Sequence, residues 1–204
     1  MVRQRVRIRF AKQSDLRMVG HRDLVRTMER CFRRAGIRLG MSQGFHPKPR
    51  MTFPAALAVG IEGIDEVMEM ELAEALPADA LLERLAGVGV PGLRFLHAEI
   101  LPPGAKKARP GWFTYRMPVP PPYREAAARA VDRVAVGQSG PPEGPPGPDR
   151  LAALRLVDGT LTMRFRVTGG GGGPGPRGML AELGLGELER QGCCLVRSAV
   201  ELEP

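Results

Sequence analysis

The stretch His21–Arg50, HRDLVRTMERCFRRAGIRLGMSQGFHPKPR, predicts a helix, a glycine stop, a short strand and an ordered loop in direct succession. Gly36 fits the position just past the end of a helix over residues 22–35. The apolar residues of that helix recur at spacings of three and four, which predicts one buried stripe, formed by Leu24, Val25, Met28, Phe32 and Ala35. The remaining faces of the helix are therefore expected to face solvent, where they are accessible to a binding partner.

Arginines follow one side of this predicted helix at steps of four, four and three residues, at Arg22, Arg26, Arg30 and Arg33. The surrounding sequence is equally biased, because residues 1–50 hold 14 Lys and Arg against 3 Asp and Glu. A localised basic surface of this kind indicates a nucleic-acid partner. A solvated basic face, or a surface that docks an acidic protein, would give the same pattern.

The loop Ser42–Arg50 has a composition unlike that of a linker. Pro47 and Pro49 fix two φ angles and favour extended geometry in the residues before them. An aromatic residue between cations can stack on a base while the cations bind phosphates. The candidate contacts in the loop are Gln43, Phe45, His46, Lys48 and Arg50. For Phe45 taken alone, the commoner fate of a large apolar residue is burial in the core.

Hydrophobic periodicity predicts an α+β fold. The first half is expected to contain strands and helices in the order β, α, β, β, β, α, β, with the elements at residues 3–10, 22–35, 37–41, 51–59, 67–72, 77–85 and 93–101. With one strand taken as an insertion, this is a ferredoxin-like βαββαβ half with an extra strand. Alternation places Glu69 and Glu71 on the solvent side. It also gives the first strand an exposed row of arginines, which would form an open basic sheet face.

The second half repeats the pattern more weakly, and Asp158-Gly159 predicts a tight hairpin within it. We therefore expect two ferredoxin-like halves in tandem. The first is a basic domain at residues 1–101, followed by a linker at 102–111. The second, degenerate half covers residues 112–204 and carries a Pro/Gly-rich, disordered insertion at 137–149. The glycine-rich segment 168–176 lacks the Gly-Lys-Ser/Thr of a nucleotide-binding P-loop and is expected to be a flexible loop.

Composition excludes several classes of protein. Hydrophobic residues make up 43 % of the chain, which argues against a disordered protein. No apolar run approaches the length of a membrane span and no secretory signal is visible, so we expect a cytoplasmic protein with no membrane association. The three cysteines, Cys31, Cys193 and Cys194, fit neither a disulfide framework nor a metal site. We expect no cofactor.

A catalytic alternative involves the two histidines of the basic region. His21 and His46 would serve as a general acid–base pair in metal-independent RNA cleavage through the 2′-hydroxyl group. Spacing alone does not bring them together.

Residues 20–72, GHRDLVRTMERCFRRAGIRLGMSQGFHPKPRMTFPAALAVGIEGIDEVMEMEL, resemble the radical-SAM-linked protein family of bacteria. Members of that family are free-standing or form the C-terminal part of cobalamin-type radical-SAM proteins. This chain has no Cys-x3-Cys-x2-Cys run, so the resemblance implies an accessory partner of a separately encoded radical-SAM enzyme. The first half is also similar, at the level of fold, to ferredoxin-like RNA-processing proteins of CRISPR systems.

These observations together predict a non-catalytic RNA-binding accessory protein. It would present RNA to a radical-SAM modifying enzyme through the basic helix and the GFHPKPR loop. The endoribonuclease and the protein-docking adaptor remain as alternatives.

Overall fold

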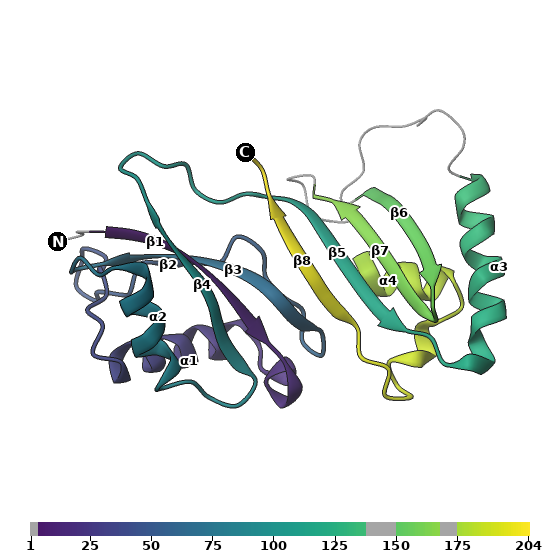
Figure 1. The fold of residues 1–204 in the computed structure, drawn as a ribbon, viewed down its shortest axis with the longest axis horizontal. Coiled ribbons are helices and arrows are strands. Elements are labelled where there is room, and N and C mark those ends of the chain that lie inside the picture. Colours follow the sequence, from purple (N-terminus) through teal and green to yellow (C-terminus); the bar gives the residue numbers. More distant parts are fainter. Residues whose placement is uncertain (1–3, 138–149, 168–174) are drawn as a thin grey trace. The chain divides into compact units, whose positions relative to one another are not determined.

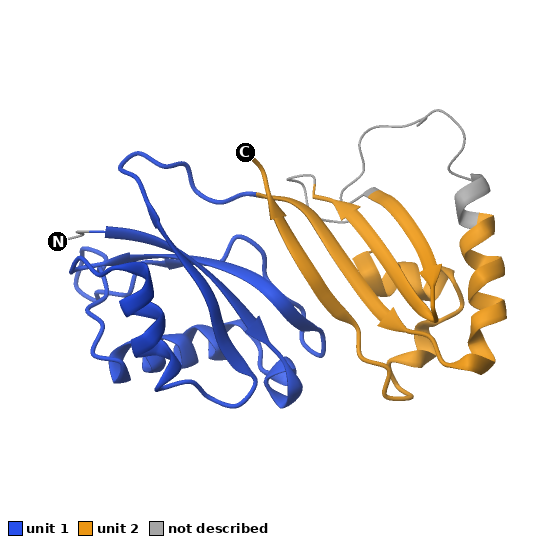
Figure 2. Ribbon diagram, in the orientation of Figure 1, with its two compact units in different colours: residues 1–109 blue, residues 110–204 orange. Residues whose placement is uncertain are grey.

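The computed structural model describes residues 4–137, 150–167 and 175–204. The chain divides into two compact units, residues 1–109 and residues 110–204 (Figure 2). The boundary lies within the segment 102–111, which composition marks as a linker.

Unit 1 has the element order β, α, β, β, α, β, apart from a short 3-10 helix at Ser14–Met18. Its main elements are β1 (Gln4–Lys12), α1 (His21–Arg34), β2 (Met51–Thr52), β3 (Glu62–Leu72), α2 (Ala78–Ala86) and β4 (Leu93–Leu101) (Figure 1). The strands form an antiparallel sheet in the order β4-β1-β3-β2. The central strand β1 therefore has a neighbour on each side.

The core of unit 1 lies between one face of this sheet and its two helices. Val6 and Ile8 of β1 point to that face and are fully buried, as the alternation of β1 predicts. They belong to the same apolar cluster as Phe32 of α1 and Leu85 of α2. Both helices therefore cover one face, and the opposite face carries Arg5, Arg7 and Arg9 along with their cross-strand neighbours.

Unit 2 repeats this order. Its elements are β5 (Pro110–Pro118), α3 (Pro121–Gly137), β6 (Arg150–Val157), β7 (Thr160–Arg166), α4 (Gly175–Glu182) and β8 (Val196–Leu202). The strands run antiparallel in the order β8-β5-β7-β6. Asp158 and Gly159 join β6 to β7 with φ of 49° and 71°, which confirms the predicted hairpin, because such turns need two positive φ angles.

The predicted α+β class is confirmed, but the predicted extra strand in the first half is wrong. Residues 37–41 make only two isolated bridges, Leu39 to Leu72 and Met41 to Pro49. Strand pairing is likewise confined to Met51–Thr52 in the segment 51–59, where we expected a longer edge or bulged strand. Pro54 lies two residues after the end of this strand and has no N–H to donate to a ladder.

Two predicted features fall largely outside the described residues. The Pro/Gly-rich insertion 137–149 begins at the last residue of α3, and residues 138–149 are not described. Residues 168–174 of the glycine-rich segment are also not described, while Gly175 and Pro176 already belong to α4.

Candidate nucleic-acid interface

Helix α1 presents its arginines to solvent along one side. Its buried residues are Leu24, Thr27, Met28, Cys31 and Phe32, so the apolar stripe predicted from spacing faces the sheet in large part. Rotation of 100° per residue places the four predicted arginines within about 80° of one another on the helix surface. All four are exposed: Arg22, Arg26, Arg30 and Arg33. We call this set the α1 row.

The α1 row is only partly neutralised. Arg26 donates to the carboxylate of Asp23 at 3.1 Å, in an exposed pair that contributes little stability. Arg30 donates to the neutral hydroxyl of Thr27 at 3.1 Å. The side chains of Arg22 and Arg33 make no hydrogen bond or ion pair with the described residues, so most of the positive charge of the row remains available to an anion.

The loop between α1 and β2 is closed at its neck by backbone hydrogen bonds. The N–H of Ser42 donates to the carbonyl oxygen of Lys48 at 2.8 Å, and the Lys48 N–H donates back to the Ser42 hydroxyl at 2.9 Å. One step lower, the Arg50 N–H donates to the Gly40 carbonyl at 2.8 Å. Gly40 itself lies against β3, where an added Cβ would stand 2.9 Å from the Glu71 Cβ. The neck thus anchors the loop on unit 1.

The tip of this loop projects into solvent. Phe45 is 102 % exposed and makes no ring contact with the described residues, so its expected burial is wrong. Gly44 before it has φ of 130°, which residues with a Cβ rarely adopt. Gln43, His46 and Lys48 are exposed as well, and their side chains have no partner in the described part of the chain. Burying apolar area cannot explain a phenylalanine in this position.

A groove joins the α1 row to the loop neck. Its wall on the helix side includes Arg33, and its wall on the loop side includes Met41 and Pro49. The C-terminal end of the α1 row and the base of the loop therefore share one surface of unit 1.

The arginines of β1 are arranged differently. Arg7 donates to the Glu69 carboxylate from Nη2 at 2.9 Å and from Nε at 3.2 Å, and Arg9 donates to Asp65 at 2.9 Å. The Glu69 side chain is only 6 % exposed, and it also accepts from the Ala108 N–H at 3.1 Å. The predictions that Glu69 is solvent-facing and that the arginines form an open basic sheet face are both wrong. The arginines pair with carboxylates of β3, and the segment 105–108 packs against Glu69 through the Ala108 N–H.

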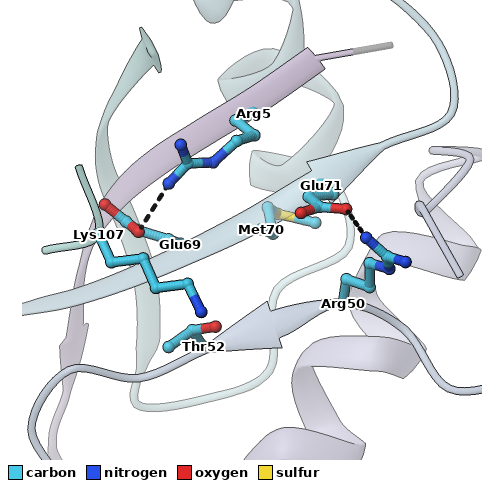
Figure 3. Close-up of a pocket in the computed structure, with 7 residues that line it drawn as sticks. All are labelled: Arg5, Arg50, Thr52, Glu69, Met70, Glu71 and Lys107. Carbon is cyan, nitrogen blue, oxygen red and sulfur yellow. Dashed lines mark hydrogen bonds and ion pairs between the residues drawn. The ribbon is translucent and has the colours of Figure 1, made fainter. Parts of the chain in front are cut away.

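A small pocket of about 80 Å³ lies on this face of unit 1 (Figure 3). Its lining includes three cations and two carboxylates, and two ion pairs cross it, Arg5 to Glu69 at 3.4 Å and Arg50 to Glu71 at 3.1 Å. The ammonium group of Lys107 makes no ion pair or hydrogen bond among the described residues. Lys107 is therefore an unneutralised cation in a pocket that Arg50, at the end of the loop, also lines.

A family model described as "Uncharacterized protein conserved in bacteria (DUF2344)" matches residues 5–138. The match covers about two thirds of the chain, including all of unit 1 from Arg5 onward. The chain belongs to the DUF2344 family. A search of curated proteins returned no match.

The structure does not join the two histidines of this DUF2344 chain. His21 packs its ring edge-on against Phe53, with centroids 5.2 Å apart, and it has no hydrogen-bond or ring contact with His46 in the described residues. No group of three or more His, Cys, Asp or Glu side chains capable of holding a metal ion occurs there either. None of the described helices is long and apolar enough to cross a membrane.

Sequence patterns missed two parts of this surface. Lys107 lies in a segment whose Pro/Gly composition indicates a linker, and only the folded chain brings it into the pocket that Glu69 and Arg50 also line. Glu29, Arg38 and Met41 line the groove, but they come from a helix and an irregular segment whose relative placement no periodicity predicts. The nine RNA-contact residues predicted from sequence, which are the α1 row and the five candidate residues of the loop, are all exposed on unit 1.

Proposed function

We propose that this protein binds single-stranded RNA through the α1 row and the loop that follows it. The observation that carries the proposal is the wholly exposed Phe45, which precedes His46 and Lys48 at the tip of a loop with a hydrogen-bonded neck. Single-stranded nucleic acids are bound by aromatic side chains on which bases stack, beside cations that follow the backbone. An exposed aromatic tip, on a loop whose neck shares a groove with Arg33 of the arginine row, meets both requirements.

We interpret each of the two units as a ferredoxin-like fold, and this interpretation supports the proposal. Both units have the element order βαββαβ with the strand orders β4-β1-β3-β2 and β8-β5-β7-β6, which match the order expected for a split βαβ unit. The fold alone assigns no activity. We further propose that the bound RNA is presented to a radical-SAM modifying enzyme; this step rests on the sequence resemblance of residues 20–72.

The test is RNA binding across a salt series with matched charge reversals. Neutralising four phosphates by the α1 row predicts a slope of about −3 in log K against log[salt] on a single strand. Arg26→Glu/Arg30→Glu should weaken binding strongly and reduce that slope by about 1.4. Arg129→Glu/Arg133→Glu, with the same spacing and charge change on α3, is the control and should bind almost as well as the wild type.

Two other outcomes would redirect the proposal. No RNA binding even at low salt would refute it and leave the α1 row as a docking face for an acidic protein. RNA cleavage that survives a chelator and is lost in His46→Ala would indicate the endoribonuclease instead.

A further inference from the structure

The groove beside α1 has the dimensions of a binding site for a small group. Its volume is about 520 Å³, within the range of about 300–1,000 Å³ that is typical of small-molecule sites. Its apolar lining is supplied by Ile37, Leu39, Met41 and Pro49. Met41 is 44 % exposed although it is one of the larger apolar side chains. A flat aromatic group would cover this apolar surface.

The rim of the groove carries an acceptor with no donor. Glu29 is half-buried, and its carboxylate makes no hydrogen bond or ion pair with any described residue. Arg33, one turn further along α1, has no partner there either. Arg38 on the other rim is held near Glu74, with its Nε 3.6 Å from that carboxylate. An ionised carboxylate only accepts, so Glu29 is complementary to a ligand that presents donors.

We propose that this groove receives one guanine base of the bound RNA. The inference rests on the proposed RNA binding and adds a base preference to it. Guanine presents two adjacent donors, N1–H and the N2 amino group, to the two oxygens of the Glu29 carboxylate. Uracil presents one N–H between two carbonyl oxygens, which a carboxylate repels. Adenine and cytosine present an amino group beside a ring-nitrogen acceptor, so each makes fewer favourable contacts.

The surrounding groups fit the remainder of a nucleotide. The apolar surface of Met41 and Pro49 contacts the face of the base, and the guanidinium of Arg33 lies on the rim, where it pairs with an adjoining phosphate. Arg33 also belongs to the α1 row, so the groove and the row bind consecutive parts of one strand. Sequence-specific RNA recognition commonly reads the Watson–Crick edges of such splayed bases.

The experiment measures fluorescence anisotropy of a labelled ten-nucleotide uridine strand and of the same strand with one central guanosine, adenosine or cytidine. We expect the guanosine strand to bind most tightly, by about fivefold or more over the uridine strand, as for other bidentate base contacts. Glu29→Gln should remove most of that preference without weakening binding to the uridine strand. Glu83→Gln, an exposed carboxylate of α2, is the matched control and should keep the wild-type ranking.

The outcomes separate the two proposals. Equal binding of all four strands by the wild type overturns the guanine pocket and leaves RNA binding intact. A guanosine preference that survives in Glu29→Gln overturns the assignment of Glu29. Failure of every strand to bind at low salt overturns the proposed function and the base preference together.

Discussion

Phe45→Ala separates binding from folding more sharply than other changes at this surface. The side chain is completely exposed and makes no ring contact with the described residues. Its removal therefore uncovers no core, and the free energy of unfolding should change by less than about 0.5 kcal/mol. Stacking on a base contributes about 1–3 kcal/mol, so RNA affinity should fall by about 5- to 150-fold.

Phe53→Ala is the matched control because Phe53 does have structural neighbours. Its ring packs edge-on against Phe10, at 6.2 Å between centroids, and against His21. A fully buried Phe→Ala change costs about 3–5 kcal/mol, and Phe53 is half-buried, so we expect a loss of about 2 kcal/mol. For a unit of this size, the melting temperature should fall by about 8 °C.

The assay pairs chemical unfolding with anisotropy titration of a single-stranded RNA at a temperature where both variants are folded. The reasoning requires opposite responses, with Phe45→Ala losing affinity at wild-type stability and Phe53→Ala losing stability. Wild-type affinity in folded Phe45→Ala would refute the stacking role. A large loss of stability in that variant would refute the exposure on which the role depends.

Two further predictions concern buried ionisable groups of unit 1. Glu69→Ala should destabilise the protein by about 2–4 kcal/mol in denaturant unfolding, since it removes the two closest hydrogen bonds of Arg7 and leaves the Ala108 N–H without its acceptor. Glu99→Ala removes an exposed carboxylate 3.4 Å from Arg7 and should cost less than about 1 kcal/mol, so equal losses would contradict this assignment. Burial raises the pKa of the Cys31 thiol, and the charges of Arg34 and Arg30 oppose that shift. The contribution of the neutral thiol to stability should therefore be complete below the unfolded thiol pKa of about 8.5 and decline as pH rises above it. When unfolding is followed from pH 7 to 10, the free energy of unfolding should fall more steeply in the wild type than in Cys31→Ala.

Sequence patterns predicted elements well wherever one face is buried. The period of α1 and the alternation of β1 both reflect contact with one apolar core, so spacing alone indicates them. The segment 37–41 fails this test, because its backbone is held by contacts with β3 and by the close approach of Gly40 to Glu71. Contacts of that kind depend on residues far apart in the chain. The same limit hid the groove, whose walls meet only after α1 and the loop neck are placed.

Exposure of Phe45 shows a different limit. Large apolar residues are usually buried, and a rule based on residue type places Phe45 in the core. The neck hydrogen bonds and the positive φ of Gly44 instead direct the tip outward. A residue that departs from the general rule in this way is a better candidate for function than one that obeys it.

The distribution of charge shows which basic residues serve the fold. The 14 cations of residues 1–50 look alike in the sequence, and residues 51–110 supply 9 Asp and Glu to balance them. In the structure, three of those acids form ion pairs with arginines of β1, namely Glu69, Asp65 and Glu99. Along α1, by contrast, the α1 row makes one ion pair among the described residues, and it is local, from Arg26 to Asp23. The β1 arginines are thus held by cross-strand carboxylates, whereas the side chains of Arg22 and Arg33 have no partner among the described residues. The basicity of the strand is therefore structural, whereas that of α1 is available for a polyanion.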